Sequence, residues 1–191
     1  MRLAIFGGTF DPIHKAHLMV AEEAADQFHL DRVLFIPAAH PPHKSGTHTP
    51  FEHRYRMVEL ACACDPRFLP SRLEDGTERS YSYHTIERVK ASLAPGDDLL
   101  FVIGADAFAE IRTWYRTEDV LRMVTFLVVT RPGHDYDVPE GARVVRLDTL
   151  ALPVSSSEIR QTLAAGEESP HLTAEVAAYI REHGLYRPAA R

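Results

Sequence analysis

The sequence predicts an α/β fold, in which a doubly wound parallel sheet is followed by a C-terminal helical appendix. Short runs rich in Val, Ile, Leu and Phe alternate with helical patterns over residues 1–150, as in a buried parallel sheet with helices on both faces. After residue 150 only helical patterns follow. The 191 residues contain no internal repeat and no linker, so we expect one domain, 1–191, with the helices of 151–191 packed on a sheet core of 1–150.

The expected elements follow in chain order. Apolar runs predict strands at 3–6, 32–37, 99–103 and 126–130, with a weaker strand at 143–147. Helical patterns predict helices at 15–28, 51–63 and 83–93, with a shorter one near 105–112. Ser155 is expected to cap a further helix, and the last helix is expected to begin near Thr173 and end near Gly184. Because ligands of such sheets bind beyond the carboxyl ends of strands, functional residues are expected just after the strand-like runs.

The composition indicates the cellular compartment of the protein and the binding partners that are disfavoured. A formal net charge of −6 disfavours non-specific binding to nucleic acid or to an anionic membrane. Cys62 and Cys64 stand two positions apart on a predicted helix, which favours neither a disulfide nor a shared metal, so we interpret both as core residues in a reducing compartment. The sequence shows no secretory signal pattern and no apolar run of membrane-spanning length, and we expect a cytoplasmic protein.

The most informative segment joins the first expected strand to the first expected helix. It reads Gly7-Gly8-Thr9-Phe10-Asp11-Pro12-Ile13-His14-Lys15-Ala16-His17. Glycines let backbone N–H groups approach a ligand, and the first turn of a helix offers unpaired donors and a positive dipole end. His14 and His17 project from one side of that turn. The segment matches neither the P-loop nor the G-x-G-x-x-G pattern, and it predicts a site for a chain of phosphates.

These residues carry a family resemblance. The pattern G-G-T-F-D-P-x-H-x-x-H resembles the N-terminal signature of the nucleotidyltransferases with a Rossmann-like fold, whose hallmark is His-x-Gly-His, although Ala16 stands in place of the glycine. Ser155-Ser156-Ser157-Glu158-Ile159-Arg160 resembles the second signature of that superfamily. Within it, the chain is most similar to the bacterial nicotinate-nucleotide adenylyltransferases, and the similarity runs from residue 3 to residue 186.

The resemblance implies transfer of the adenylyl group of ATP to nicotinate mononucleotide, which gives the deamido dinucleotide and pyrophosphate in NAD biosynthesis. It implies that the catalytic residues are His14, His17, Lys44 and Arg160. The ATP-binding residues implied are Gly7, Gly8, Thr9, Phe10, His17, Gly104, Asp106, Ser155, Ser156 and Arg160. The residues implied for nicotinate mononucleotide are Lys44, Ser82, Tyr83, Thr85, Trp114 and Arg131, with Ser82 where the family has a threonine.

Mg²⁺ arriving with ATP is the metal we expect, since Mg²⁺ commonly binds through substrate phosphates, and we expect no tightly bound organic cofactor. A metal centre at His40 and His43 is disfavoured, because the chain has no ligand set at zinc spacing and no H-E-x-x-H. The expected partners are the two small-molecule substrates, without nucleic acid or membrane. The oligomeric state stays open, a homo-oligomer included.

Three alternatives stay open at this point. The motifs do not distinguish nicotinate mononucleotide from nicotinamide mononucleotide as the substrate of this reaction. A phosphopantetheine adenylyltransferase is disfavoured by the Gly-Gly-Thr-Phe-Asp-Pro opening, by the length and by Thr113-Trp114-Tyr115. A non-catalytic nucleotide-binding regulator is disfavoured because His14, His17 and Arg160 are all present.

Overall fold

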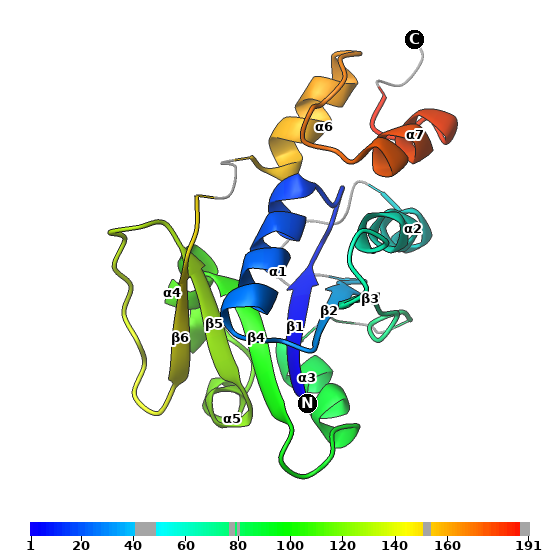
Figure 1. Cartoon of the computed structure of the whole chain (residues 1–191). Helices are drawn as coiled ribbons and strands as arrows, with labels where there is room; N and C mark the ends of the chain where they lie inside the picture. The colour runs from blue at the N-terminus through cyan, green and yellow to red at the C-terminus, as the bar shows by residue number, and fades with distance from the viewer. Residues whose placement is uncertain (41–48, 77–78, 80, 151–153, 188–191) are drawn as a thin grey trace.

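The computed structural model describes residues 1–40, 49–76, 79, 81–150 and 154–187, and within them the chain forms a six-stranded sheet. All its strands are parallel, in the order β3-β2-β1-β4-β5-β6 (Figure 1). The strands are β1 (Arg2–Gly8), β2 (Arg32–Pro37), β3 (Phe68–Pro70), β4 (Asp98–Gly104), β5 (Thr125–Thr130) and β6 (Arg143–Asp148). The strand order reverses between β1 and β4, which makes the sheet doubly wound and Rossmann-like. The predicted fold class is confirmed.

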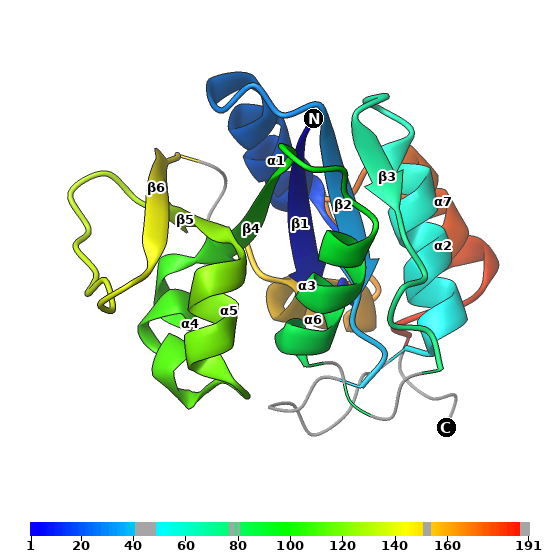
Figure 2. The ribbon, with the colours of Figure 1, turned by 90° about the horizontal axis from the view of Figure 1, so that it is seen from below.

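Helices cover both faces of this sheet. They are α1 (Lys15–Gln27), α2 (Phe51–Cys62), α3 (Ser82–Ala91), α4 (Ala105–Ala109), the 3₁₀ helix η1 (Ile111–Thr113), α5 (Thr117–Met123), α6 (Ser156–Ala164) and α7 (Ala174–Glu182). Figure 2 shows α1 on one side of the sheet and α3, α4 and α5 on the other, with α2 and α7 next to each other near β3.

The core is divided by the sheet into two clusters, because successive side chains of a strand point to opposite faces. In β1, Ala4 belongs to the cluster that contains α1 and α2, whereas Leu3 and Ile5 belong to the cluster that contains α3, α4 and α5. Ile159 of α6 and Ile180 of α7 are buried in the first cluster, so both C-terminal helices pack against the same core as α1.

Each predicted strand is present with its ends within two residues, and the strand predicted at 32–37 is β2 without any shift. Two elements were not predicted. The first, β3, has three residues and ends in Pro70, which lacks a backbone N–H and is tolerated because β3 lies at the sheet edge. The second, α5, has seven residues and is too short to give a clear helical period.

The predicted serine cap of α6 is present, and Thr173, at the predicted start of the last helix, is the cap of α7. Ser155 caps α6 and its side chain accepts the N–H of Glu158, while Thr173 caps α7 and accepts the N–H of Val176. The prediction for the cysteines is half wrong: Cys62 is buried, but Cys64 lies beyond the end of α2 and is exposed. No helix among the described residues has the length and apolar character that a membrane span requires.

Candidate active site

Three cavities meet at the carboxyl ends of β1 and β4, where the strand order reverses. The histidine cavity, of about 410 Å³, is lined by His14, His17, Ser155, Ser156, Ser157 and Arg160, among others. The Asp106 cavity, of about 700 Å³, is lined by Gly104, Asp106, Thr130, Arg131, Ser155 and Glu158, among others. The Trp114 cavity, of about 250 Å³, is lined by Gly7, Gly8, Glu74, Ser82, Thr85, Gly104 and Trp114, among others.

The three cavities adjoin one another through shared lining residues, and we refer to them together as the groove. Ala16 and Ser155 line both the histidine cavity and the Asp106 cavity. Gly104 lines the Asp106 cavity and the Trp114 cavity, and Phe6 lines the histidine cavity and the Trp114 cavity. Ala16, the residue that replaces the glycine of the family signature, therefore borders two of the three cavities.

The two signature histidines stack at the start of α1. Their ring centroids are 3.8 Å apart with an interplanar angle of 27°. The backbone N–H of His14 donates to Nδ1 of His17 at 3.2 Å. Because Nδ1 of His17 accepts this bond, the neutral ring carries its proton on Nε2, which makes Nε2 a hydrogen-bond donor. His17, with this proton on Nε2, is one of the residues that line the histidine cavity.

His14 is held as a neutral ring at pH 7. It is buried, and burial, with the charge of His171 as the smaller cause, lowers the pKa of His14 to about 4. Its Nδ1 is buried and has no hydrogen-bond partner within the residues that the structure describes. A buried polar atom of this kind is costly unless a ligand or a water molecule meets it.

The second signature is tied directly to the first. Nη1 of Arg160 donates to the carbonyl oxygen of Asp11 at 2.7 Å, and Nη2 donates to Oγ of Ser157 at 3.1 Å. Oγ of Ser156 donates to the carbonyl oxygen of Pro12 at 2.9 Å. The N-terminus of α6 is therefore fixed against the loop that leads into α1.

A capping box closes the first turn of α6. The backbone N–H of Ser155 donates to Oε2 of Glu158 at 2.7 Å, and the N–H of Glu158 donates to Oγ of Ser155 at 3.2 Å. Hydrogen bonds from the Ser155 side chain and backbone hold the pKa of Glu158 below its usual value. The Ser155 hydroxyl, predicted to contact ATP, is engaged in this box.

The double glycine has two different roles. A Cβ added to Gly7 would meet open space, so this backbone is accessible from the Trp114 cavity. A Cβ added to Gly8 would lie 3.0 Å from the ring of Phe10, so the absence of a side chain there lets that ring pack inside. Phe10 is buried in the core against Phe6 and His17 and lines none of the three cavities. Its predicted contact with ATP has no support from its side chain.

A buried arginine holds the loops that follow β1 and β2. Nη1 of Arg54 donates to the carbonyl oxygens of Thr9 and Ala38, each at 2.8 Å, and Nε donates to that of Thr49 at 3.0 Å. The guanidinium is enclosed, and this burial lowers the pKa of Arg54. Thr9 therefore contributes its carbonyl to the architecture of the loop and lines none of the three cavities.

The Trp114 cavity brings together residues that are far apart in the sequence. Ser82 and Thr85 come from the first turn of α3, and Trp114 follows η1. Oγ1 of Thr85 donates to Oε1 of Glu74 at 2.5 Å, and Glu74 is itself a buried carboxylate that lines the cavity. Glu74 was not predicted, because Glu74-Asp75-Gly76 has the composition of an exposed turn.

Two further predicted site residues, Arg131 and Tyr83, are placed differently from the prediction, and a third cannot be compared. Arg131, predicted to bind the mononucleotide with Trp114, lines the Asp106 cavity instead. The side chain of Tyr83 lines none of the three cavities and turns toward α5, where it meets Arg116. Lys44 lies outside the described residues.

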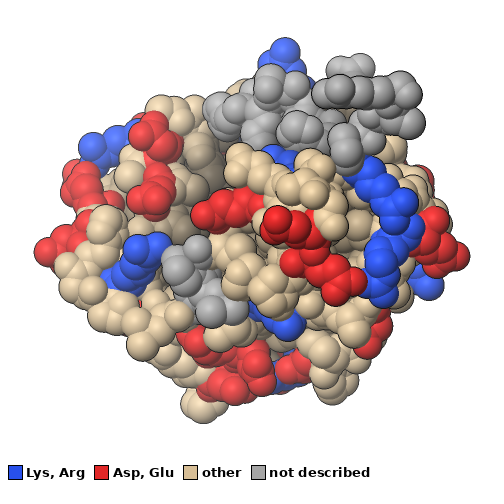
Figure 3. Space-filling model, turned by 90° about the horizontal axis from the view of Figure 1, so that it is seen from above, with Lys and Arg blue, Asp and Glu red and all other residues tan. Residues whose placement is uncertain are grey.

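The charges around the carboxyl ends of the strands are mixed. Figure 3 views the molecule from above Figure 1, and acidic and basic side chains are interspersed over the described part of this face. Anion binding therefore depends on local donors such as His17 and Arg160 and not on a broad basic surface.

The fold, the switch point and the two joined signatures define a nucleotidyltransferase site. In agreement, the cytidylyltransferase-like family model matches residues 5–162 of the chain. A protein of Solibacter usitatus named "Probable nicotinate-nucleotide adenylyltransferase" is 65% identical over 187 residues, which cover 97% of this chain and 100% of that protein. A protein of Thermus thermophilus with the same name is 44% identical over 190 residues, which cover 98% of this chain and 100% of that protein. The chain belongs to the nicotinate-nucleotide adenylyltransferase family.

Solved structures share the fold. The nicotinic acid mononucleotide adenylyltransferase of Plasmodium falciparum, complexed with NaAD, superposes with a TM-score of 0.80 at 22% identity, covering 97% of each chain.

Proposed function

We propose that the protein transfers the adenylyl group of ATP to nicotinate mononucleotide, producing nicotinate adenine dinucleotide and pyrophosphate for NAD biosynthesis. The relatives named for this activity align with almost the whole chain. The structural observation that supports the proposal is the groove, in which the histidine cavity, lined by hydrogen-bond donors, adjoins two cavities that we assign to the two nucleosides.

We assign the triphosphate of ATP to the histidine cavity. Nε2 of His17, the backbone N–H groups at the start of α6 and the guanidinium of Arg160 are the hydrogen-bond donors that we assign to it. Helix N-termini favour anions through their free N–H groups and their dipole. The adenosine is assigned to the Asp106 cavity, where the carboxylate of Asp106 can accept bonds from the ribose hydroxyls.

We assign the pyridine ring of nicotinate mononucleotide to the Trp114 cavity. The indole of Trp114 offers a flat surface for stacking, and the first turn of α3 offers free backbone N–H groups to a carboxylate. Lys44 is proposed to contact a phosphate, a role that rests on the sequence pattern alone.

The reaction requires positioning more than proton transfer. An oxygen of the mononucleotide phosphate attacks the α-phosphorus of ATP, and the bond from that phosphorus to the oxygen bridging the α- and β-phosphates breaks, so that pyrophosphate leaves with the electron pair. The attacking phosphate monoester has a second pKa of about 6 and is largely ionised at pH 7, so no general base is needed. His17 and Arg160 stabilise the charge that builds on the phosphates, and the enclosed neutral ring of His14 fixes His17.

The polar side chains that line the histidine cavity are imidazoles, hydroxyls and a guanidinium, and none of them is a carboxylate, the protein group through which Mg²⁺ is usually bound. Within the described residues no group of three or more His, Cys, Asp or Glu side chains gathers around a metal position. We therefore expect Mg²⁺ to bind through the phosphates of ATP, where it would neutralise part of their negative charge.

The test is pyrophosphate release from ATP and Mg²⁺ with nicotinate mononucleotide, nicotinamide mononucleotide or phosphopantetheine offered separately. We expect kcat/KM for the acid to exceed both others by far. Equal use of acid and amide would keep the reaction type but contradict carboxylate recognition at the start of α3. Turnover of phosphopantetheine alone, or of none of the three, would contradict the proposed function.

A further inference from the structure

The Trp114 cavity has two walls that come from different elements. One wall is the first turn of α3, with Ser82 and Thr85, and the other is Trp114 from the segment between η1 and α5. A flat ring can stack on Trp114 and reach the α3 turn at the same time only if the two walls are held at a suitable separation. Contacts outside the cavity must therefore hold these walls in place.

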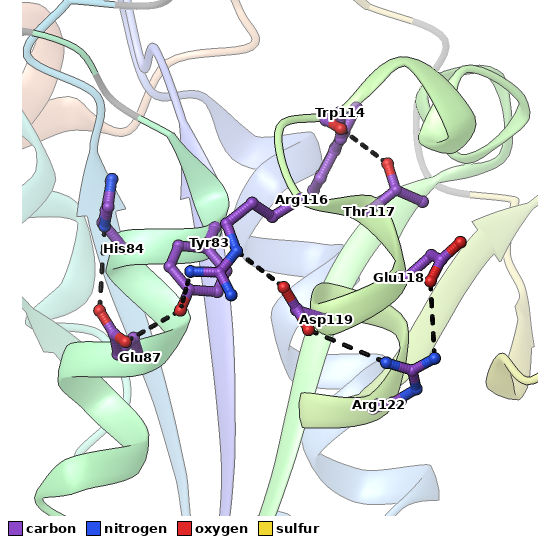
Figure 4. A network of polar contacts seen from close by, with 9 residues as sticks. All are labelled: Tyr83, His84, Glu87, Trp114, Arg116, Thr117, Glu118, Asp119 and Arg122. Atoms are coloured by element: carbon purple, nitrogen blue, oxygen red, sulfur yellow. Dashed lines mark hydrogen bonds and ion pairs between the residues drawn. The ribbon is translucent and has the colours of Figure 1, made fainter.

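Arg116 connects the two elements that carry these walls (Figure 4). Its Nη1 donates to the hydroxyl of Tyr83 at 2.8 Å, and its Cζ lies 4.2 Å from the centre of the Tyr83 ring. Its Nε donates to Oδ2 of Asp119 in α5 at 2.7 Å. The exposed ion pair with Asp119 contributes little by itself, so the connection depends mainly on the contacts with Tyr83.

The side chain of Tyr83 is held in place by its burial and by a hydrogen bond within α3. It is buried in the core, and its hydroxyl donates to Oε1 of Glu87 one turn further along α3 at 3.0 Å. That bond raises the pKa of Tyr83, so the phenol stays protonated. Tyr83 stands between Ser82 and Thr85, and a contact that fixes it therefore fixes the first turn of α3.

The backbone conformation of the segment that carries Trp114 also favours the contact between Arg116 and Tyr83. Arg116 has φ 54° and ψ 43°, a left-handed conformation that is uncommon for residues other than glycine, asparagine and aspartate. The Thr117 hydroxyl lies 2.7 Å from the carbonyl oxygen of Trp114 and 2.8 Å from that of Ile111 and donates to them. The neighbouring Tyr115 lies against Tyr81, with ring centroids 5.0 Å apart. The strained backbone turns the Arg116 side chain toward α3 while Trp114 faces the cavity.

We propose that Arg116 is a positioning residue for the pyridine-binding wall: by clamping Tyr83 to the segment before α5, it sets the separation between Trp114 and the first turn of α3. Arg116 does not line the Trp114 cavity and acts through Tyr83 and Trp114. The inference rests on the proposed function for the identity of the ring that the cavity accepts. The clamp itself can be tested without any substrate.

Trp114 is the only tryptophan of the chain, so its fluorescence reports directly on this wall. In Arg116→Ala we expect acrylamide to quench Trp114 more strongly than in the wild type. We also expect KM for nicotinate mononucleotide to rise about tenfold while KM for ATP stays within about twofold, because one cation–π contact and one hydrogen bond are lost on one side of the groove only. Tyr83→Phe, which keeps the ring, should show the same pattern with a smaller rise.

Arg122→Ala is the matched control, since Arg122 pairs with Glu118 and Asp119 in the same network but does not reach Tyr83. It should behave like the wild type in both measurements. If Arg116→Ala does not fold, Arg116→Gly replaces it, because glycine adopts the left-handed conformation without strain. Wild-type quenching together with wild-type KM values in the Arg116 variants would overturn the proposal, as would an equal rise of KM for both substrates.

The two proposals fail in different ways. If the wild type does not use nicotinate mononucleotide, the proposed function fails, while stronger quenching of Trp114 in the Arg116 variants would still support the clamp. If the wild type is active and the variants are unchanged, only the clamp fails.

Discussion

The histidine cavity and the Trp114 cavity lie side by side at the end of β1, yet they are held together in different ways. Around the histidine cavity, the side chains of Arg160 and Ser156 bond to the backbone carbonyls of Asp11 and Pro12. Around the Trp114 cavity, the walls are joined by contacts between side chains, such as Arg116 with Tyr83 and Thr85 with Glu74. Because a backbone carbonyl has no rotamers, we expect the first cavity to be the more rigid of the two. The difference suits a site where the anion must be placed accurately and the second ring must enter and leave.

The comparison predicts that changes at the histidine cavity act on kcat and that changes at the Trp114 cavity act on KM for one substrate. The largest expected effect is that of His17→Ala, which should lower kcat about 10²–10³-fold, because it removes the hydrogen-bond donor that we propose for the phosphates. Steady-state pyrophosphate release measures it, with His183→Ala on the exposed end of α7 as the control. A near-normal kcat in His17→Ala would contradict the prediction that changes at the histidine cavity act on kcat.

The next effect concerns the stability of the histidine cavity as the pH falls. The pKa of His14 is about 4 in the folded protein and 6.5 in its ordinary state. Between these values the unfolded chain binds a proton that the folded protein does not, so this group's stability contribution is complete above about pH 6.5 and is lost as the pH falls toward 4. The full loss amounts to about 3 kcal/mol.

His14→Asn tests this dependence, since asparagine is polar and does not titrate. Urea unfolding at pH 7 and pH 4.5 should show that the wild type loses about 2 kcal/mol more free energy of unfolding than the variant. An equal loss in both proteins would mean that His14 is not held neutral by its burial.

Trp114→Ala tests the other cavity. Loss of the stacking surface should raise KM for nicotinate mononucleotide about 10–100-fold, from the buried area and the stacking interaction together. KM for ATP should hardly change, and Trp114→Phe should give an intermediate value. A comparable rise of KM for ATP would show that the two cavities are not independent.

The smallest effect is expected for Ser156→Ala, which removes the bond from Oγ to the carbonyl oxygen of Pro12. One hydrogen bond of this kind contributes about 1 kcal/mol, and Tm should fall by about 2–4 °C. Thr162→Ala is the control in the same helix, because the Thr162 hydroxyl bonds within α6 to the carbonyl oxygen of Glu158. If the Tm values of both variants fall equally, the hydrogen bond between Ser156 and Pro12 does not contribute to the stability of the protein.

The sequence predicts well those features that depend on a few consecutive residues. The strand ends, the cap at Ser155 and the meeting of His14, His17 and Arg160 in one cavity all follow from local patterns and from the two signatures. Phe10 and Tyr83 were assigned to substrates because of their place in a motif, whereas the structure turns Phe10 into the core and Tyr83 toward α5.

Glu74 and Arg116 show why the rest could not be predicted. Each acts through a partner that the fold brings near, Thr85 for Glu74 and Tyr83 for Arg116. Neither lies in a periodic segment, and an exposed turn is the ordinary interpretation of both surroundings. Only the packing of α3 against α5 makes the pair of Arg116 and Tyr83 visible.

The bond from Arg160 to Asp11 joins positions that are 149 residues apart, which has a consequence for synthesis on the ribosome. The N-terminal strand and α1 emerge from the ribosome first. The carbonyl oxygens of Asp11 and Pro12 can accept the hydrogen bonds from Arg160 and Ser156 only after α6 has been synthesised. A nascent chain that ends before α6 can collapse around the sheet and still hold an unfinished anion site. Nucleotide binding should therefore begin late in translation, after nearly all of the fold has already formed.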